Sequence, residues 1–201
     1  MLIDSETISA SVLVEVAAEA GIAFDRTHVR DHFLGRSFPT VARSIREGFG
    51  RDLPEGFEAA YRARLLARFE GELAPTEGVI DLLGRLSVPA CIATSSSPPR
   101  AVRSLAIAGI APFGLRVFTA SETMGASPPR CLVVEDSLPG VQAARAAGMG
   151  VLLYAGGGHM AGPLPAAFDM DPPLAAFRSW AAIERAVPGL ARPPDRRPAA
   201  P

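Results

Sequence analysis

The stretch LVVEDSLPGVQAARAAGM, residues 132–149, decides the fold. A short apolar run of the kind that forms a buried strand ends in two adjacent acids, Glu135 and Asp136, and a helical pattern begins at once. Ser137 is a residue type that caps helix N-termini, a proline follows in the first turn, and a glycine stops the pattern. The stretch therefore predicts a strand followed directly by a helix, with two carboxylates at the carboxyl end of the strand.

Short apolar runs alternate with helical patterns on both sides of this stretch, from Pro75 to about residue 187. We expect strands within Val88–Thr94, Leu115–Thr119, Cys131–Glu135 and Gly150–Tyr154, and helices at Glu77–Leu86, Pro99–Gly109 and Leu138–Ala147. Such alternation is typical of a parallel sheet covered by helices, so the expected fold class is α/β with a Rossmann-like core.

A purely helical pattern precedes this core. Apolar residues between residues 6 and 74 recur at helical spacing, as at Val12, Val16 and Ala20, and glycine or proline divides the segment into roughly four helices. The expected organisation is a leading segment at 1–5, a helical domain at 6–74, the α/β core at 75–187 and a tail at 188–201. The tail is rich in proline and arginine, and we expect it to be disordered.

The composition argues against some classes of binding partner and favours one cellular compartment. The 201 residues carry a formal charge of −1, so no overall field attracts nucleic acid or an anionic membrane. Cys91 and Cys131 each lie in an apolar run, which favours buried thiols in a reducing cytoplasm. The N-terminus has acids where a signal peptide needs cations, and no apolar run approaches membrane-spanning length. Nothing in the pattern indicates an oligomeric state.

Polar residues gather after two of the expected strands. Ligands of such sheets bind at the carboxyl ends of the strands, where Thr94 and Ser95 follow one strand and Glu135 and Asp136 another. Adjacent acids at a strand end suit Mg²⁺, which takes few carboxylates and keeps water or phosphate as its other ligands. An alternative for the two acids is that Asp136 caps the helix while Glu135 is solvated. An alternative for the hydroxyl cluster, Thr94 and Ser95, is that it forms a turn or a helix cap.

Residues 135–149 resemble the metal-binding motif of the haloacid dehalogenase superfamily, in its β-phosphoglucomutase and phosphoglycolate phosphatase-like branch. That motif reads E-D-S-x-x-G-x-x-A-A-x-A-A-G-M, and every fixed position is present. The resemblance implies that Asp136 binds Mg²⁺ with support from Glu135, and that Thr94 and Ser95 hold the transferring phosphoryl group. It also implies that the helical segment is an inserted cap, and that the activity is that of a phosphatase or phosphomutase of small phosphorylated metabolites working through an aspartyl-phosphate.

Arg36 and His159 lie outside these motifs. Arg36 lies where the cap of this family presents a substrate-facing loop, so it is a candidate partner for a phosphate or carboxylate; a solvated surface arginine is the alternative. His159 follows three glycines and has no partner that the sequence identifies, so we interpret it as part of a loop.

The sequence departs from the family pattern at the nucleophile. The first motif of the family reads D-x-D-G-T-L-[VIL]-D-S-E, and residues 2–6 resemble only its end. Met1 falls where the threonine belongs, so we expect the nucleophile, the acid/base aspartate and their strand to lie outside the sequence, as in a truncated chain. Asp4 matches the later aspartate, and we expect it to act as a hinge or to cap a helix. Losing the strand should leave two inner strand edges exposed and the sheet incomplete.

The second departure is at the family's lysine. All 20 positions counted as lysine or arginine are arginine. The segment before Cys131 is only about ten residues long, which is short for a parallel crossover. Arg100, Arg116 and Arg130 are candidate sources of positive charge, although a planar guanidinium on another element does not replace an ammonium.

Two hypotheses follow. One is a catalytically impaired member of an enzyme lineage; the other is a non-catalytic binding or interaction protein that keeps the scaffold.

Overall fold

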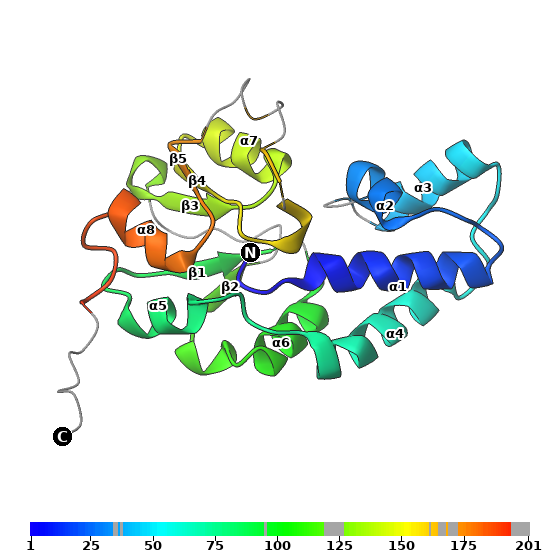
Figure 1. The fold of residues 1–201 in the computed structure, drawn as a ribbon, viewed down its shortest axis with the longest axis horizontal. Helices are drawn as coiled ribbons and strands as arrows, with labels where there is room; N and C mark the ends of the chain where they lie inside the picture. Colours follow the sequence, from blue (N-terminus) through cyan, green and yellow to red (C-terminus); the bar gives the residue numbers. More distant parts are fainter. Residues whose placement is uncertain are drawn as a thin grey trace.

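The computed structural model describes residues 1–33, 36, 38–94, 96–118, 127–160, 162–164, 168 and 173–193 (Figure 1). Four helices come first: α1 (Ser5–Glu19), α2 (Arg26–His32), α3 (Phe38–Phe49) and α4 (Phe57–Glu72). The remainder alternates: α5 (Val79–Arg85), β1 (Cys91–Ala93), α6 (Pro98–Ile107), β2 (Arg116–Phe118), β3 (Leu132–Glu135), α7 (Leu138–Ala146), β4 (Gly150–Tyr154), β5 (Ala175–Phe177) and α8 (Trp180–Ala186), with short 3-10 turns η1 (Ala111–Phe113), η2 (Pro128–Arg130) and η3 (Gly158–Met160). This order confirms an α/β fold with a helical cap.

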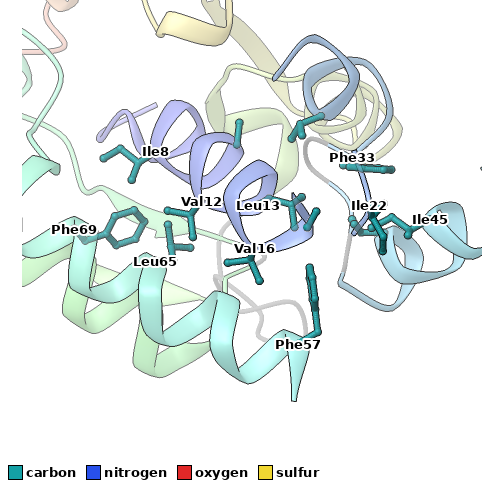
Figure 2. Packing of buried hydrophobic residues seen from close by; sticks show 14 of the residues in the cluster. Ile8, Val12, Leu13, Val16, Ile22, Phe33, Ile45, Phe57, Leu65 and Phe69 are labelled. Atoms are coloured by element: carbon teal, nitrogen blue, oxygen red, sulfur yellow. The ribbon is translucent and has the colours of Figure 1, made fainter. Parts of the chain in front are cut away.

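The cap has a core of its own. The apolar face of α1 packs on α4, with Val12 of α1 beside Leu65 and Phe69 of α4 (Figure 2). Further along α1, Leu13 contributes to the same cluster as Ile45 of α3. These side chains are almost fully buried, which removes their apolar area from water and stabilises the cap.

The strands form two parallel sheets instead of one. β1 pairs with β2, and separately β3 pairs with β4 and β4 with β5. Among the described strands, β1 and β2 therefore each have one unpaired edge, as do β3 and β5. This arrangement agrees with the expectation of an incomplete sheet interrupted between the strands that end near Thr94 and Glu135.

Burial follows this break. The residues of β4 after Gly150 are buried, because β4 has a partner on each side and helices cover it. β3 is only half-buried, and its first residue, Leu132, is 39% exposed. β1 is likewise no more than half-buried. β1 and β3, whose carboxyl ends carry the candidate site residues, are therefore less buried than β4.

The cap is joined to the sheets by two adjacent linkers. Ile3 forms an antiparallel bridge with Pro75, so the chain enters and leaves the cap side by side. The Thr76 hydroxyl lies 2.9 Å from the Met1 carbonyl and accepts a hydrogen bond from Trp180 Nε1 at 2.8 Å. This contact fixes the first residues of the chain near the ends of the strands, as Figure 1 shows for the N-terminus.

The expected elements were mostly found, with shorter strands. The strand at Gly150–Tyr154 has the bounds that the pattern predicted, whereas the run Val88–Thr94 yields only the three residues of β1. The sequence analysis missed β5 and α8. The short segment before β3 falls largely on residues 119–126, which lie outside the described part of the chain.

The expected disordered tail at 188–201 is wrong for residues 188–193. Residues 188–193 are not a loose extension: Ser87 N–H donates to the Leu190 carbonyl, Arg192 N–H donates to the Arg85 carbonyl, and Ala191 bridges Leu86. The proline-rich composition predicted disorder wrongly here, because Leu190 and Ala191 pack against the apolar residues of α5 and α8. Residues 194–201 lie outside the described residues.

Within the described residues, no helix is both long enough and apolar enough to cross a membrane.

Candidate functional site

The turn between β3 and α7 is built around the Glu135 carboxylate. Its Oε2 accepts hydrogen bonds from Asp136 N–H at 2.6 Å, from Ser137 N–H at 2.8 Å and from the Ser137 hydroxyl at 3.0 Å. Ser137 in turn accepts from Gly140 N–H at 3.2 Å and caps α7. A Cβ at Gly140 would lie only 2.5 Å from Glu135 Oε1, so only glycine leaves room for this carboxylate. The motif E-D-S-x-x-G therefore places Glu135, Ser137 and Gly140 in contact within one turn.

Burial raises the pKa of Glu135, and the nearby charge of Asp136 raises it further, against the effect of the three hydrogen bonds. Because Oε2 accepts hydrogen bonds from the turn, Glu135 holds the turn in shape, and this oxygen does not point outward. The structure does not show Glu135 as solvated, which was one alternative. Helix capping, the alternative for Asp136, is done by Ser137.

Asp136 is the acid that presents its carboxylate. Its side chain is 18% exposed, and Oδ2 lies 2.8 Å from the N-terminal ammonium of Met1. His159 Nε2 lies 3.3 Å from the Asp136 carbonyl oxygen and 3.7 Å from Oδ2. The Asp136 carboxylate thus lies at the carboxyl end of β3, which is where the sequence predicted a metal ligand.

The donor set fits a weakly held, largely hydrated cation. Among the described residues, no group of three or more His, Cys, Asp or Glu side chains is arranged to hold a metal ion. Mg²⁺ tolerates such a set, because it keeps several waters and binds through one or two carboxylates plus substrate phosphate. Asp136 would hold Mg²⁺ directly, and Glu135 would hold the turn that presents Asp136.

Thr94, one of the two candidate phosphate-binding hydroxyl residues, lies at the end of the other sheet. Thr94 follows β1, donates its N–H to the Phe118 carbonyl at 3.0 Å, and accepts Ser96 N–H on its hydroxyl oxygen at 3.1 Å. That contact is a local turn, as the alternative interpretation held, and it leaves the hydroxyl proton available for another acceptor. Ser95 lies outside the described residues. Within the described part of the chain, no hydrogen bond or ion pair joins Thr94 to Asp136.

Of the arginines considered as sources of charge, Arg100 lies nearest in sequence to the hydroxyl cluster. It sits in the first turn of α6, donates from Nη2 to Ser9 at 3.2 Å, and lies 5.6 Å from the centre of the Phe69 ring. Arg116 stacks on Phe118, and Arg130 precedes β3, at the amino ends of their strands. Arg36 is exposed in the cap between α2 and α3, and its neighbours Gly35 and Ser37 lie outside the described residues.

A family model for haloacid dehalogenase-like hydrolases matches residues 2–148. The chain belongs to the haloacid dehalogenase-like hydrolase family. It is similar to the 6-phosphogluconate phosphatase of Escherichia coli (strain K12), with 26% identity over 176 residues that cover 79% of this chain and 80% of that protein. Membership confirms the family resemblance, and the chain is by family an enzyme.

Solved structures of the family share the fold. A haloacid dehalogenase-like protein of Agrobacterium tumefaciens superposes with a TM-score of 0.77 at 24% identity, covering 92% of each chain. A haloacid dehalogenase family hydrolase of Deinococcus radiodurans R1, solved with bound phosphate and sodium, gives a TM-score of 0.74 at 27% identity, covering 96% of this chain and 94% of that one.

Against the family's motifs, the 201 residues contain no D-x-D-G-T stretch and no lysine. Asp4, which matches the end of the first motif, stands at the N-cap position of α1, but its side chain makes no hydrogen bond to a helix N–H. It accepts the Gly158 N–H at 3.1 Å instead. The expected capping role is thus not what the structure shows, because the loop after β4 occupies the carboxylate.

The contact of His159 with Asp136, and the use of the three glycines before it, were not predicted from the sequence. The signal was present, since three consecutive glycines permit backbone to approach closely on several sides. Without the fold, nothing in the sequence indicated that this loop returns to the turn bearing Asp136.

Proposed function

We propose that this chain binds a phosphate monoester together with Mg²⁺ at the carboxyl ends of β1 and β3. The observation that supports this most is the Asp136 carboxylate, which is presented at the carboxyl end of a strand that pairs in parallel with β4. Family membership and the phosphatase relative support phosphatase or phosphomutase chemistry. That relative's name favours a small phosphorylated sugar or sugar acid as the substrate.

The proposed roles follow from position. Asp136 holds the cation, Glu135 holds the turn, and Thr94 with Ser95 contacts the phosphoryl group. Arg36 contacts the far end of the substrate from the cap. When bound, Mg²⁺ supplies positive charge to the phosphate oxygens. The cap at 6–74 and core at 75–187 remain the proposed domains, and the half-buried thiols favour a cytoplasmic location.

We further propose that the 201-residue chain binds its ligands but does not turn them over efficiently by itself. Aspartyl-phosphate chemistry needs an attacking carboxylate and a balancing cation, and the corresponding motifs are not in this sequence. The second candidate is a non-catalytic binding protein. The absence of the two motifs favours it, and so does the partial burial of strands β1 and β3.

The test is ligand binding. Amide spectra of the labelled chain should shift at Asp136 on addition of Mg²⁺, and at Thr94 on addition of inorganic phosphate in the presence of Mg²⁺. Asp136→Asn should abolish the Mg²⁺ response, because a neutral amide is a poor ligand for a hard cation. Asp52→Asn, an exposed change in the cap, should leave it intact. A wild-type chain that shows neither response would overturn the proposal.

A further inference from the structure

The loop that follows β4 is shaped by three successive glycines, each against a different neighbour. A Cβ at Gly156 would lie 2.6 Å from the Tyr154 hydroxyl and would overlap the Arg178 carbonyl. A Cβ at Gly157 would lie 2.9 Å from the His159 ring, and one at Gly158 would lie 2.9 Å from the Thr7 hydroxyl. At Gly156 the overlap is with backbone, so only glycine fits there, whereas a Cβ at Gly157 or Gly158 would force the neighbouring side chain to shift.

The loop is also anchored at both sides. Asp4, at the start of the cap, accepts the Gly158 N–H, and η3 packs against α1. On the other side Arg178 donates from Nη1 to the Ala155 carbonyl at 3.1 Å and the Met160 carbonyl at 3.3 Å. Hydrogen bonds from a charged guanidinium are stronger than neutral ones. The anchors hold the loop between the base of the cap and the end of β5.

His159 projects from this loop onto the turn that bears Asp136. Its side chain is 10% exposed. Because a carbonyl oxygen only accepts, the 3.3 Å contact with the Asp136 carbonyl requires the proton on Nε2. Nδ1 is buried and has no hydrogen-bond partner within the described residues. Within the described residues, the ring's polar contacts are therefore both to Asp136, at the carbonyl oxygen and, at 3.7 Å, at Oδ2.

We propose that His159 is a positioning residue for Asp136: its Nε2–H holds the β3–α7 turn, so that the carboxylate keeps the orientation in which it binds the cation. The part concerning the cation rests on the proposed function; the part concerning the turn does not. Groups that orient a metal-binding carboxylate typically contribute a factor of about 10 to 100 in metal affinity. Through Asp4, the same loop connects the base of the cap to that carboxylate.

The experiment compares His159→Ala, His159→Gln and the matched surface change His32→Ala, using Mg²⁺ titrations followed by amide spectra and hydrogen exchange of the Asp136 and Ser137 amides. We expect His159→Ala to weaken Mg²⁺ binding about 10-fold or more and to speed exchange of both amides. His159→Gln should restore most of both, since its amide nitrogen also donates to a carbonyl. His32→Ala should change neither.

The two parts fail separately. If the wild-type chain binds no Mg²⁺, the proposed metal site fails, and the exchange rates still decide whether His159 holds the turn. If the wild type binds Mg²⁺ but His159→Ala binds it equally and exchange at the turn is unchanged, the positioning role is refuted. Should His159→Ala fail to fold, a His159→Gln protein with wild-type affinity, set against a much weaker His159→Leu, would support the role, and equal affinities would refute it.

Discussion

Glycine at position 140 is required by the side chain that precedes it by five residues. The Glu135 carboxyl lies where a Cβ at position 140 would be, so Gly140→Ala must displace Glu135 and open the turn. We expect this change to cost about 1–3 kcal/mol of stability, as overpacking does. Gly48→Ala is the matched control, because Gly48 lies in α3 with open space around it and should gain about 0.5–1 kcal/mol. Urea unfolding of both variants checks the prediction, and equal stabilities would contradict it.

The ionisation of Glu135 should lower the free energy of unfolding in a pH-dependent way. Because burial raises its pKa in the folded protein, the folded state binds the proton more tightly than the unfolded state. Stability from this group is therefore present below the ordinary pKa and is lost as pH rises through the raised one. In Mg²⁺-free buffer, Glu135→Gln should be more stable than wild type at pH 7, and the difference should shrink to zero as pH falls below the ordinary pKa. A difference that grows on acidification would argue against this assignment.

The strand end and the helix cap at residues 135–137 could be predicted because their contacts are local. Glu135, Asp136 and Ser137 are adjacent, so one strand end and one helix cap fix them together. His159 could not be assigned, because its contact with Asp136 spans 23 residues and depends on how the loop after β4 is anchored. Local pattern contains no information on that contact.

At the level of elements, the break between the sheets should appear in local stability. β4 is paired on both sides and buried, whereas β1 has three residues paired only with β2. We expect native-state hydrogen exchange to protect Leu152 close to the limit of global unfolding, and to find Thr94 exchanging through openings of lower free energy. Equal protection of the two amides would mean that the smaller sheet unfolds only with the whole protein.

The elements that the sequence predicted were the long or strongly patterned ones. β4 was located because its run is apolar and buried throughout. β5 was missed because three residues, two of them alanine, carry no strand pattern, and it is recognisable only through its pairing with β4. The division into two sheets was foreseen from the absence of a first-motif strand in the sequence, which is an argument from the family pattern and not from local propensity.

At the scale of the whole molecule, the cap and the β3–α7 turn are present, but the family's D-x-D-G-T stretch and lysine are not among the 201 residues. Phosphoryl transfer to aspartate needs a carboxylate within attacking distance of phosphorus, and groups that act as a unit lose most of their rate enhancement when one is missing. With Asp136 as its single outward carboxylate, the proposed site would also leave Mg²⁺ mostly hydrated and weakly bound.

We therefore expect no Mg²⁺-dependent hydrolysis of an aryl phosphate above the protein-free background by this chain, even where amide spectra show Mg²⁺ bound. Asp136→Asn should leave that background unchanged, because there is no catalysed rate for it to remove. The Asp52→Asn protein, purified in the same way, controls for contaminating phosphatase. If the wild-type chain hydrolyses the ester and Asp136→Asn alone abolishes the activity, the chain holds a nucleophile outside the family's first motif. The assignment of the chain as catalytically impaired would then be wrong.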